Sequence, residues 1–108
     1  MSIIAHLSIT EAARTIYCMA EEEHKELQGL RGQIDRKDME LLTVLMERMR
    51  IVERIGEYKR KNKLEIRDEE REKEILRDRP DRGNSRGLSR DMVREIFKSI
   101  IAYAKERE

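Results

Sequence analysis

The sequence predicts an all-α protein with three helices, one very long and two shorter. Three observations support this prediction. The 108-residue chain is rich in charged residues (44%), poor in aromatic ones (4%) and contains a single proline, Pro80. A composition dominated by Glu, Lys, Arg and Leu is typical of long amphipathic helices. The apolar residues recur at steps of three and four, and no strand-like alternation interrupts them.

The longest predicted helix runs from about residue 21 to residue 62. This segment has no proline and keeps a helical apolar pattern, and its glycines, Gly29, Gly32 and Gly56, weaken helix propensity only slightly. Forty helical residues extend roughly 60 Å at 1.5 Å per residue, which exceeds the diameter of a small domain. The rest of one short chain cannot cover such a helix, so the sequence predicts a partner chain.

The N-terminal residues are set apart from this helix. Ser8 and Glu11 have the spacing of a capping box, which predicts a short helix over residues 9–19. The alternative is an extension that the core does not need. We therefore divide the chain into an N-terminal extension, residues 1–20, and one domain, residues 21–108.

Two shorter helices follow the long one. Residues 62–67 are predicted to connect the first helix to the second, and Asp68 stands at a favourable N-cap position. Pro80 and the glycine-containing loop after it are predicted to end the second helix. Ser89 is predicted to cap a third helix that runs to the end of the sequence.

Charge and cysteine content exclude several classes of protein. The 24 basic residues nearly balance the 23 acidic ones, so no overall positive field favours nucleic-acid binding. No apolar run approaches 18 residues, so no membrane-spanning helix is expected. The single cysteine, Cys18, rules out an intrachain disulfide and favours a reducing, cytoplasmic location.

One stripe along the long helix mixes apolar and charged residues. Alternating steps of three and four connect Arg31, Ile34, Asp38, Leu41, Leu45, Arg48, Val52, Ile55 and Lys59. One interpretation is an imperfect coiled-coil seam whose long cationic side chains reach water. The other is a polar pocket, because a buried cation needs a partner that an anionic ligand would supply. The regular spacing of three cations favours the pocket.

The spacing of these cations constrains what they bind. Arg48 and Lys59 lie about 16 Å apart along the helix axis, so their side chains can grip a small molecule between them. Arg31 lies about 25 Å before Arg48, which is too far to reach the same ligand within one straight helix. It can reach that ligand only from an antiparallel second chain. The sequence therefore predicts a symmetric dimer with sites shared between chains.

The shorter helices carry two further stripes. Their members are Asp68, Arg71, Glu72 and Ile75 on the second helix, and Phe97, Ile101, Ala104 and Glu108 on the third. Taken alone, the charged pair in the second helix is typical of a solvated surface. Glu108, as the last residue, is typical of a frayed end when it is considered alone.

Taken together, three segments resemble the helical chorismate mutases (the AroQ class). They are "LRGQIDRKDMELLTVLMERM", "IGEYKRKNKLEIRDEEREKEIL" and "IFKSIIAYAKERE", and the resemblance covers roughly residues 27–108. It implies an intertwined helical homodimer that rearranges chorismate to prephenate in phenylalanine and tyrosine biosynthesis. No metal or cofactor is expected, since the reaction is a Claisen rearrangement within one molecule.

The resemblance also implies a role for individual residues. Arg48 and the partner subunit's Arg31 correspond to arginines that grip the substrate's carboxylates. Lys59 and Glu108 correspond to the two hydrogen-bond donors to the ether oxygen. Glu72 corresponds to the acid that accepts a hydrogen bond from the ring hydroxyl. The remaining implied contacts are Asp68 and Arg71 beside Glu72, Ala104 near a carboxylate, and Ile55, Ile75 and Ile101 as walls around the ring.

Two positions depart from the family pattern. Ala104 stands where a small hydroxyl residue is common, so one carboxylate contact is lost or replaced by water. Glu108 stands where glutamine also occurs, and a carboxyl group donates a hydrogen bond only when it is protonated. We therefore expect activity to fall as the pH rises through the titration of Glu108.

Two alternatives remain open at this stage. An isochorismate pyruvate-lyase would use a similar cationic pocket on a related substrate. A helical dimerisation or regulatory module would keep the scaffold without catalysis. The sequence argues against the second alternative, because a scaffold needs neither Arg48 nor Lys59 on its apolar seam.

Overall fold

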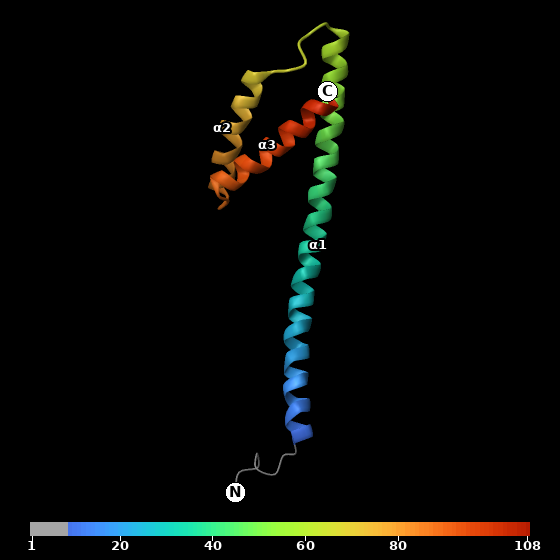
Figure 1. The fold of residues 1–108 in the computed structure, drawn as a ribbon, viewed down its shortest axis with the longest axis vertical. Helices are drawn as coiled ribbons and strands as arrows, with labels where there is room; N and C mark the ends of the chain where they lie inside the picture. Colours follow the sequence, from blue (N-terminus) through green and yellow to red (C-terminus); the bar gives the residue numbers. More distant parts are fainter. Residues whose placement is uncertain (1–8) are drawn as a thin grey trace. The chain divides into compact units, whose positions relative to one another are not determined.

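The computed structural model describes residues 9–108 of the chain, with side chains at residues 10–16 and 24–108. The described residues form three α-helices joined by short connections: α1 (Ile9–Lys61), α2 (Glu69–Ser85) and α3 (Arg90–Arg107) (Figure 1). This architecture confirms the predicted all-α class, with one very long helix and two shorter ones. Over the described residues, none of these helices is both long and apolar enough to cross a bilayer.

Helix α1 is longer than the sequence predicted. It runs without a break from Ile9 to Lys61, so the short helix expected over residues 9–19 is its first part. Its continuity is explained by the absence of proline and by the strong helix formers Ala and Glu in its N-terminal third. The predicted cap at Ser8 lies outside the described residues.

The end of α1 is held by main-chain hydrogen bonds. Lys63 adopts a left-handed backbone conformation (φ 56°), which turns the chain out of the helix. The Leu64 amide then donates to the Lys59 carbonyl at 2.8 Å, and the Asn62 amide donates to the Tyr58 carbonyl at 3.0 Å. These bonds satisfy carbonyl groups that a helix end leaves without partners.

Helix α2 begins as predicted but ends later. The Asp68 carboxylate accepts a hydrogen bond from the Arg71 amide at 3.0 Å, which confirms the predicted N-cap. The prediction that Pro80 ends the helix was wrong, because α2 continues to Ser85. Proline removes only one helical hydrogen bond, and Pro80 is fully buried, so the packing of its ring stabilises the helix that its backbone weakens.

A tight turn leads from α2 into α3. Gly87 has a φ of +88°, a value that glycine adopts without strain, and the Leu88 amide donates to the Gly83 carbonyl at 2.9 Å. The Ser89 side chain accepts from the Met92 amide at 3.3 Å, which confirms the predicted cap of α3. The turn brings α2 and α3 into contact, and Gly83 is where they approach most tightly. A Cβ atom at Gly83 would lie 2.6 Å from Cγ2 of Val93.

We expect Gly83→Ala to destabilise the protein, because the added methyl group overlaps a buried side chain. Overpacking of this kind lowers the free energy of unfolding by about 1–3 kcal/mol. Chemical denaturation followed by circular dichroism measures the change. Val93→Ala removes the overlapping methyl group, so the double variant should lose less stability than the sum of the two single variants. Strict additivity would show that the two residues do not meet.

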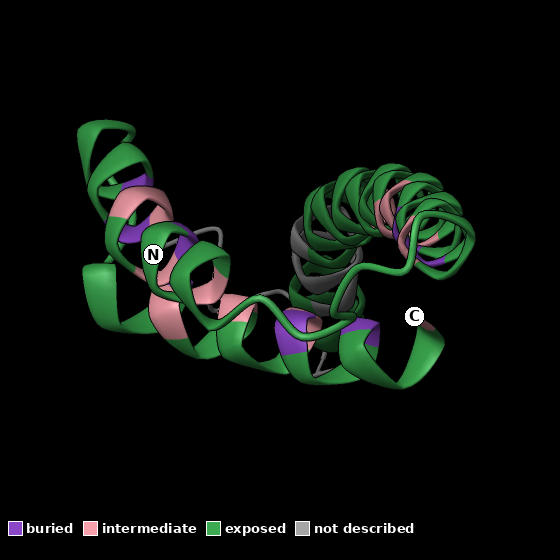
Figure 2. Ribbon diagram, turned by 90° about the horizontal axis from the view of Figure 1, so that it is seen from above, coloured by how far each residue is buried: buried purple, intermediate pink, exposed green. Residues whose placement is uncertain are grey.

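The chain divides into two compact units, residues up to Thr43 and Val44–Glu108, so α1 contributes to both. In the second unit the buried apolar side chains are few: Val52, Ile75, Pro80, Val93, Ile101 and Ala104. Figure 2 shows how much of the described ribbon is exposed. Within the first unit, large apolar side chains are exposed to between 41% and 67%, and they include Leu27, Leu30, Ile34 and Leu41.

Candidate active site

The second unit contains a cavity of about 500 Å³ that is lined by both charged and apolar side chains. Its walls come from the last part of α1, the connector, the start of α2 and the end of α3. The lining residues are Arg48, Ile51, Val52, Ile55, Lys59, Ile66, Arg67, Asp68, Arg71, Glu72, Ile75, Arg79, Ile101, Ala104, Lys105 and Glu108.

Arg48 is the most unusual of these residues electrostatically. Its Nη1 atom is buried and makes no hydrogen bond within the described protein. Burial lowers the pKa of Arg48 below its usual value, and the nearby guanidinium groups of Arg79 and Arg71 lower it further. The folded chain therefore holds this cation at an electrostatic cost, which an anion bound in the cavity would relieve.

Lys59 and Glu108 meet on another wall of the cavity. The Lys59 Nζ atom lies 3.6 Å from Oε2 of Glu108, and both side chains are only 16% exposed. The same ammonium group donates to the Ile66 carbonyl at 2.5 Å, so it is fixed by both the connector and the end of α3. An ammonium group with three donors keeps one for a ligand after making these two contacts.

Glu72 faces Lys105 across the gap between α2 and α3. The Lys105 Nζ atom lies 2.7 Å from Oε1 of Glu72, whose side chain is 20% exposed. This contact uses Oε1 of Glu72 and holds the carboxylate group in place, so that Oε2 remains available to a ligand. A carboxylate held in this way can accept a hydrogen bond from a hydroxyl group of a ligand.

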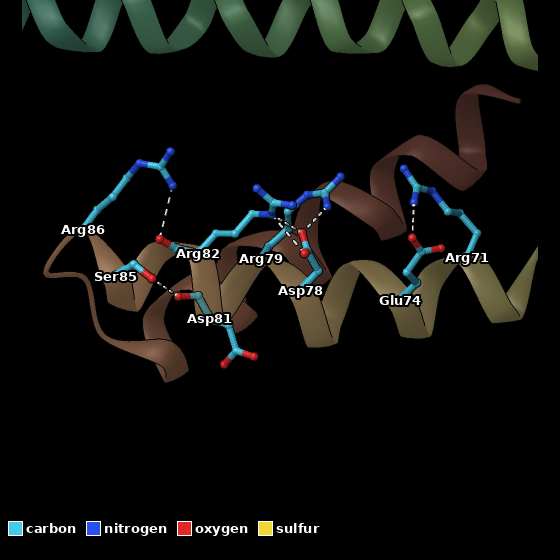
Figure 3. Close-up of polar contacts among 8 residues, drawn as sticks. All are labelled: Arg71, Glu74, Asp78, Arg79, Asp81, Arg82, Ser85 and Arg86. Atoms are coloured by element: carbon cyan, nitrogen blue, oxygen red, sulfur yellow. Dashed lines mark hydrogen bonds and ion pairs between the residues drawn. The ribbon is translucent and has the colours of Figure 1, made fainter.

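Arg71, Arg79 and Arg82 on α2 pair with acidic neighbours on the same helix (Figure 3). Arg71 pairs with Glu74 at 3.0 Å, and Arg79 pairs with Asp78 at 2.5 Å. Hydrogen bonds from Arg79, and next from Arg82, lower the pKa of Asp78. Its carboxylate form is thus favoured by folding, so the stability that it contributes is present at neutral pH and is lost as the pH falls through its titration.

Cations outnumber anions in the lining of the cavity. The six cationic residues are Arg48, Lys59, Arg67, Arg71, Arg79 and Lys105, and the three acidic ones are Asp68, Glu72 and Glu108. Because the Nη1 atom of Arg48 is also buried and has no hydrogen-bond partner in the described protein, the excess of positive charge favours a ligand that carries more than one negative charge.

Comparison with known proteins identifies the family. Residues 30–108, which form most of the chain, match the profile of chorismate mutase type II. The chain belongs to this family. Its match includes the whole of α2 and α3 and the part of α1 that lines the cavity.

Three curated relatives illustrate the context of this chorismate mutase domain. A bifunctional chorismate mutase/prephenate dehydratase of Aquifex aeolicus (strain VF5) is 51% identical over 52 residues, which are 48% of this chain and 14% of that protein. T-proteins of Enterobacter agglomerans and Haemophilus influenzae are 32% and 30% identical over 77% and 76% of this chain. The matches cover 23% and 22% of those T-proteins, so the chain spans less than a quarter of each relative. No solved structure gives a significant match.

The chorismate mutase domain brings together ten of the eleven residues predicted from the sequence to form a site. Those ten line the cavity: Arg48, Ile55, Lys59, Asp68, Arg71, Glu72, Ile75, Ile101, Ala104 and Glu108. The eleventh, Arg31, is not among the lining residues, and its place on α1 falls in the first unit. The roles of all eleven residues stay predictions.

Several lining residues were not predicted. Arg79 lies four residues after Ile75 and continues the stripe on α2 by one turn, and Lys105 lies four residues after Ile101 and thus on the same face as the stripe on α3. A longer count along α2 and α3 would have found both. Ile66 and Arg67 lie in the connector, where no periodicity indicates which way a side chain points.

Proposed function

We propose that this chain catalyses the rearrangement of chorismate to prephenate, a step in phenylalanine and tyrosine biosynthesis. The observation that carries the proposal is the buried Nη1 atom of Arg48, which has no hydrogen-bond partner in the described protein, in the same cavity as Lys59. Chorismate is a small dianion with an ether oxygen and a ring hydroxyl, and the cavity offers cations, a donor and a fixed carboxylate. Membership of the chorismate mutase type II family supports the same assignment.

The reaction needs positioning and charge stabilisation but no covalent intermediate. The ether C–O bond breaks while a C–C bond forms between the side chain and the ring, so every atom stays in one molecule. Arg48 would bind a carboxylate through its planar guanidinium group, which holds the substrate compact. Lys59 would donate to the ether oxygen, where negative charge develops in the transition state.

The remaining polar contacts fit around this core. Oε2 of Glu72 would accept a hydrogen bond from the ring hydroxyl, while Lys105 keeps the carboxylate in place. Glu108, when protonated, would be the second donor to the ether oxygen, beside Lys59. Asp68 and Arg71 would line the entrance beside Glu72, with Ala104 and the isoleucines of the cavity (Ile55, Ile75 and Ile101) enclosing the ring.

We propose that the chain acts as an intertwined homodimer in which the partner subunit's Arg31 completes each cavity. The support is the apolar surface that one chain leaves exposed on α1, including Leu30 at 50%, Ile34 at 60% and Leu41 at 57%. Contiguous exposed apolar surface of this extent is typical of an interface. On this proposal residues 21–108 form the catalytic domain and residues 1–20 an extension. A cytoplasmic location stays a prediction from the single cysteine.

Incubating the purified chain with chorismate and identifying the product by chromatography tests the assignment. We expect prephenate, both from the full chain and from a shortened chain that begins at Met19. Salicylate and pyruvate from isochorismate would instead identify an isochorismate pyruvate-lyase. If the chain consumes neither substrate, the proposed activity is contradicted, and the non-catalytic helical module is the remaining interpretation.

A pH profile tests the role of Glu108. If Glu108 is the donor, kcat should be lower in alkaline than in acidic buffer, because a carboxyl group donates only when protonated. In Glu108→Gln the amide donates at every pH, so the profile should be flatter and the difference largest at the alkaline end. Rates measured from pH 4 to pH 9 in buffers of constant ionic strength provide the comparison. Identical profiles for the two proteins would show that Glu108 is not the donor.

A further inference from the structure

The end of α3 lies directly against α1 at Gly56. A Cβ atom at this buried glycine would lie 3.0 Å from Cα and 3.3 Å from the carbonyl carbon of Glu108. Any other residue at position 56 would therefore press on the main chain of residue 108. A glycine inside a helix lowers helix stability, and this close approach gives a physical reason for its presence.

Arg60 holds the same main chain through a side-chain hydrogen bond. Its Nη1 atom donates to the Glu108 carbonyl oxygen at 2.9 Å, across 48 residues of sequence. The Nη1 atom of Arg60 would also lie 3.2 Å from a Cβ atom at Gly56, so Gly56, Arg60 and the main chain of residue 108 meet at one point. Arg60 is exposed and does not line the cavity, so it is outside the set of residues that face a ligand.

These contacts address a problem that the position of Glu108 creates. The last turn of a helix frays, and the Glu108 amide has one helical bond, to the Ala104 carbonyl at 3.1 Å. The carboxyl group must nevertheless stay beside Lys59, from which it lies 3.6 Å away. A displacement of about 1 Å is enough to weaken a catalytic contact severely.

We propose that Gly56 and Arg60 are positioning residues that fix the main chain of residue 108, and thereby hold the Glu108 carboxyl group against Lys59 for catalysis. This inference rests on the proposed chorismate mutase activity. Because Arg60 binds the main chain, the contact does not depend on whether residue 108 is glutamate or glutamine. The effect of this contact on catalysis, in contrast, requires a side chain at residue 108 that has a catalytic task.

Arg60→Met tests the proposal, with Lys61→Met as the matched control. Both substitutions remove one exposed cation, outside the cavity, from the last turn of α1, but the hydrogen bond to the main chain of residue 108 comes from Arg60. Glu108 is assigned a contact made in the transition state, so Arg60→Met should lower kcat between about tenfold and a hundredfold with little change in KM. Lys61→Met should keep the kcat of the unmodified chain.

A double-variant cycle separates positioning from a general structural effect. In a Glu108→Ala background the carboxyl group is gone, so adding Arg60→Met should cause little further loss of kcat. In a Glu108→Gln background the loss caused by Arg60→Met should persist. An equal loss in all three backgrounds, or a change confined to KM, would overturn the proposal.

Gly56→Ala perturbs the same contact without removing a charge. Alanine normally stabilises a helix relative to glycine, so a lower kcat in a variant that is as stable as the unmodified chain or more so would indicate displacement of residue 108. Unchanged kcat would contradict the inference.

Hydrogen exchange provides a readout that needs no activity. If residue 108 is held by Arg60, amides of residues 104–108 should exchange faster in Arg60→Met than in Lys61→Met. Equal exchange would overturn the proposal even if kcat falls. Absence of prephenate from the unmodified chain would instead refute the proposed function, and exchange would still decide whether Arg60 fixes the end of α3.

Discussion

Replacing Arg48 by methionine should abolish most of the proposed chorismate mutase activity while leaving the chain at least as stable as before. The guanidinium group is assigned to a substrate carboxylate, so kcat/KM should fall roughly a hundred- to a thousandfold. The free energy of unfolding should rise by about 1 kcal/mol, because methionine removes a buried donor that has no hydrogen-bond partner. Steady-state kinetics and chemical denaturation measure the two effects.

The opposition between activity and stability is the informative part of this result. Arg50→Met is a matched control, since Arg50 is exposed on the same helix and does not line the cavity. It should change neither quantity by much. A large loss of stability in Arg48→Met would show that the guanidinium group supports the fold, and retained activity would show that it does not bind the substrate.

Mixing two inactive variants should restore activity if each cavity combines Arg48 of one chain with the partner subunit's Arg31. Arg31→Met and Arg48→Met homodimers each lack one half of both sites. When equal amounts are unfolded together and refolded, half of the dimers pair one variant with the other, and each such dimer has one intact site. The mixture should therefore recover about a quarter of the activity of the unmodified protein, as a symmetric two-site dimer requires.

The variants refolded separately are the control for this experiment, and both should stay inactive. Native mass spectrometry establishes that mixed dimers have formed. A mixture that contains mixed dimers but stays as inactive as its parents would show that Arg31 does not act across the interface. Activity in Arg31→Met alone would show that this residue is not needed at all.

Helical spacing explains why so much of the cavity was predictable from the sequence. A helix fixes which residues share a face, so the stripe through Arg48, Val52, Ile55 and Lys59 had to face one way. All four line the cavity. The caps at Asp68 and Ser89 were predictable for a similar reason, since their side chains bond to main-chain groups only three residues away.

Contacts that depend on tertiary structure were not predictable in this way. Pro80 is a helix breaker by local rules, yet burial keeps it inside α2. Arg60 bonds to a carbonyl 48 residues later, and its neighbours in sequence do not indicate that partner. Gly56 carried a usable signal, because a glycine inside a strong helical pattern often marks a close approach of another chain segment.

The buried Nη1 atom of Arg48 has no hydrogen-bond partner in the described protein. Binding of a ligand in the cavity should therefore change the melting temperature of the protein. A ligand that binds only the folded state adds RT ln(1 + [L]/Kd) to its stability, about 2.7 kcal/mol at a hundred times Kd. Dianions that satisfy the buried Nη1 atom should therefore raise the melting temperature, whereas uncharged molecules of the same shape should not. Thermal-shift measurements can thus identify which small acids bind in the cavity, even if none of them is converted to a product.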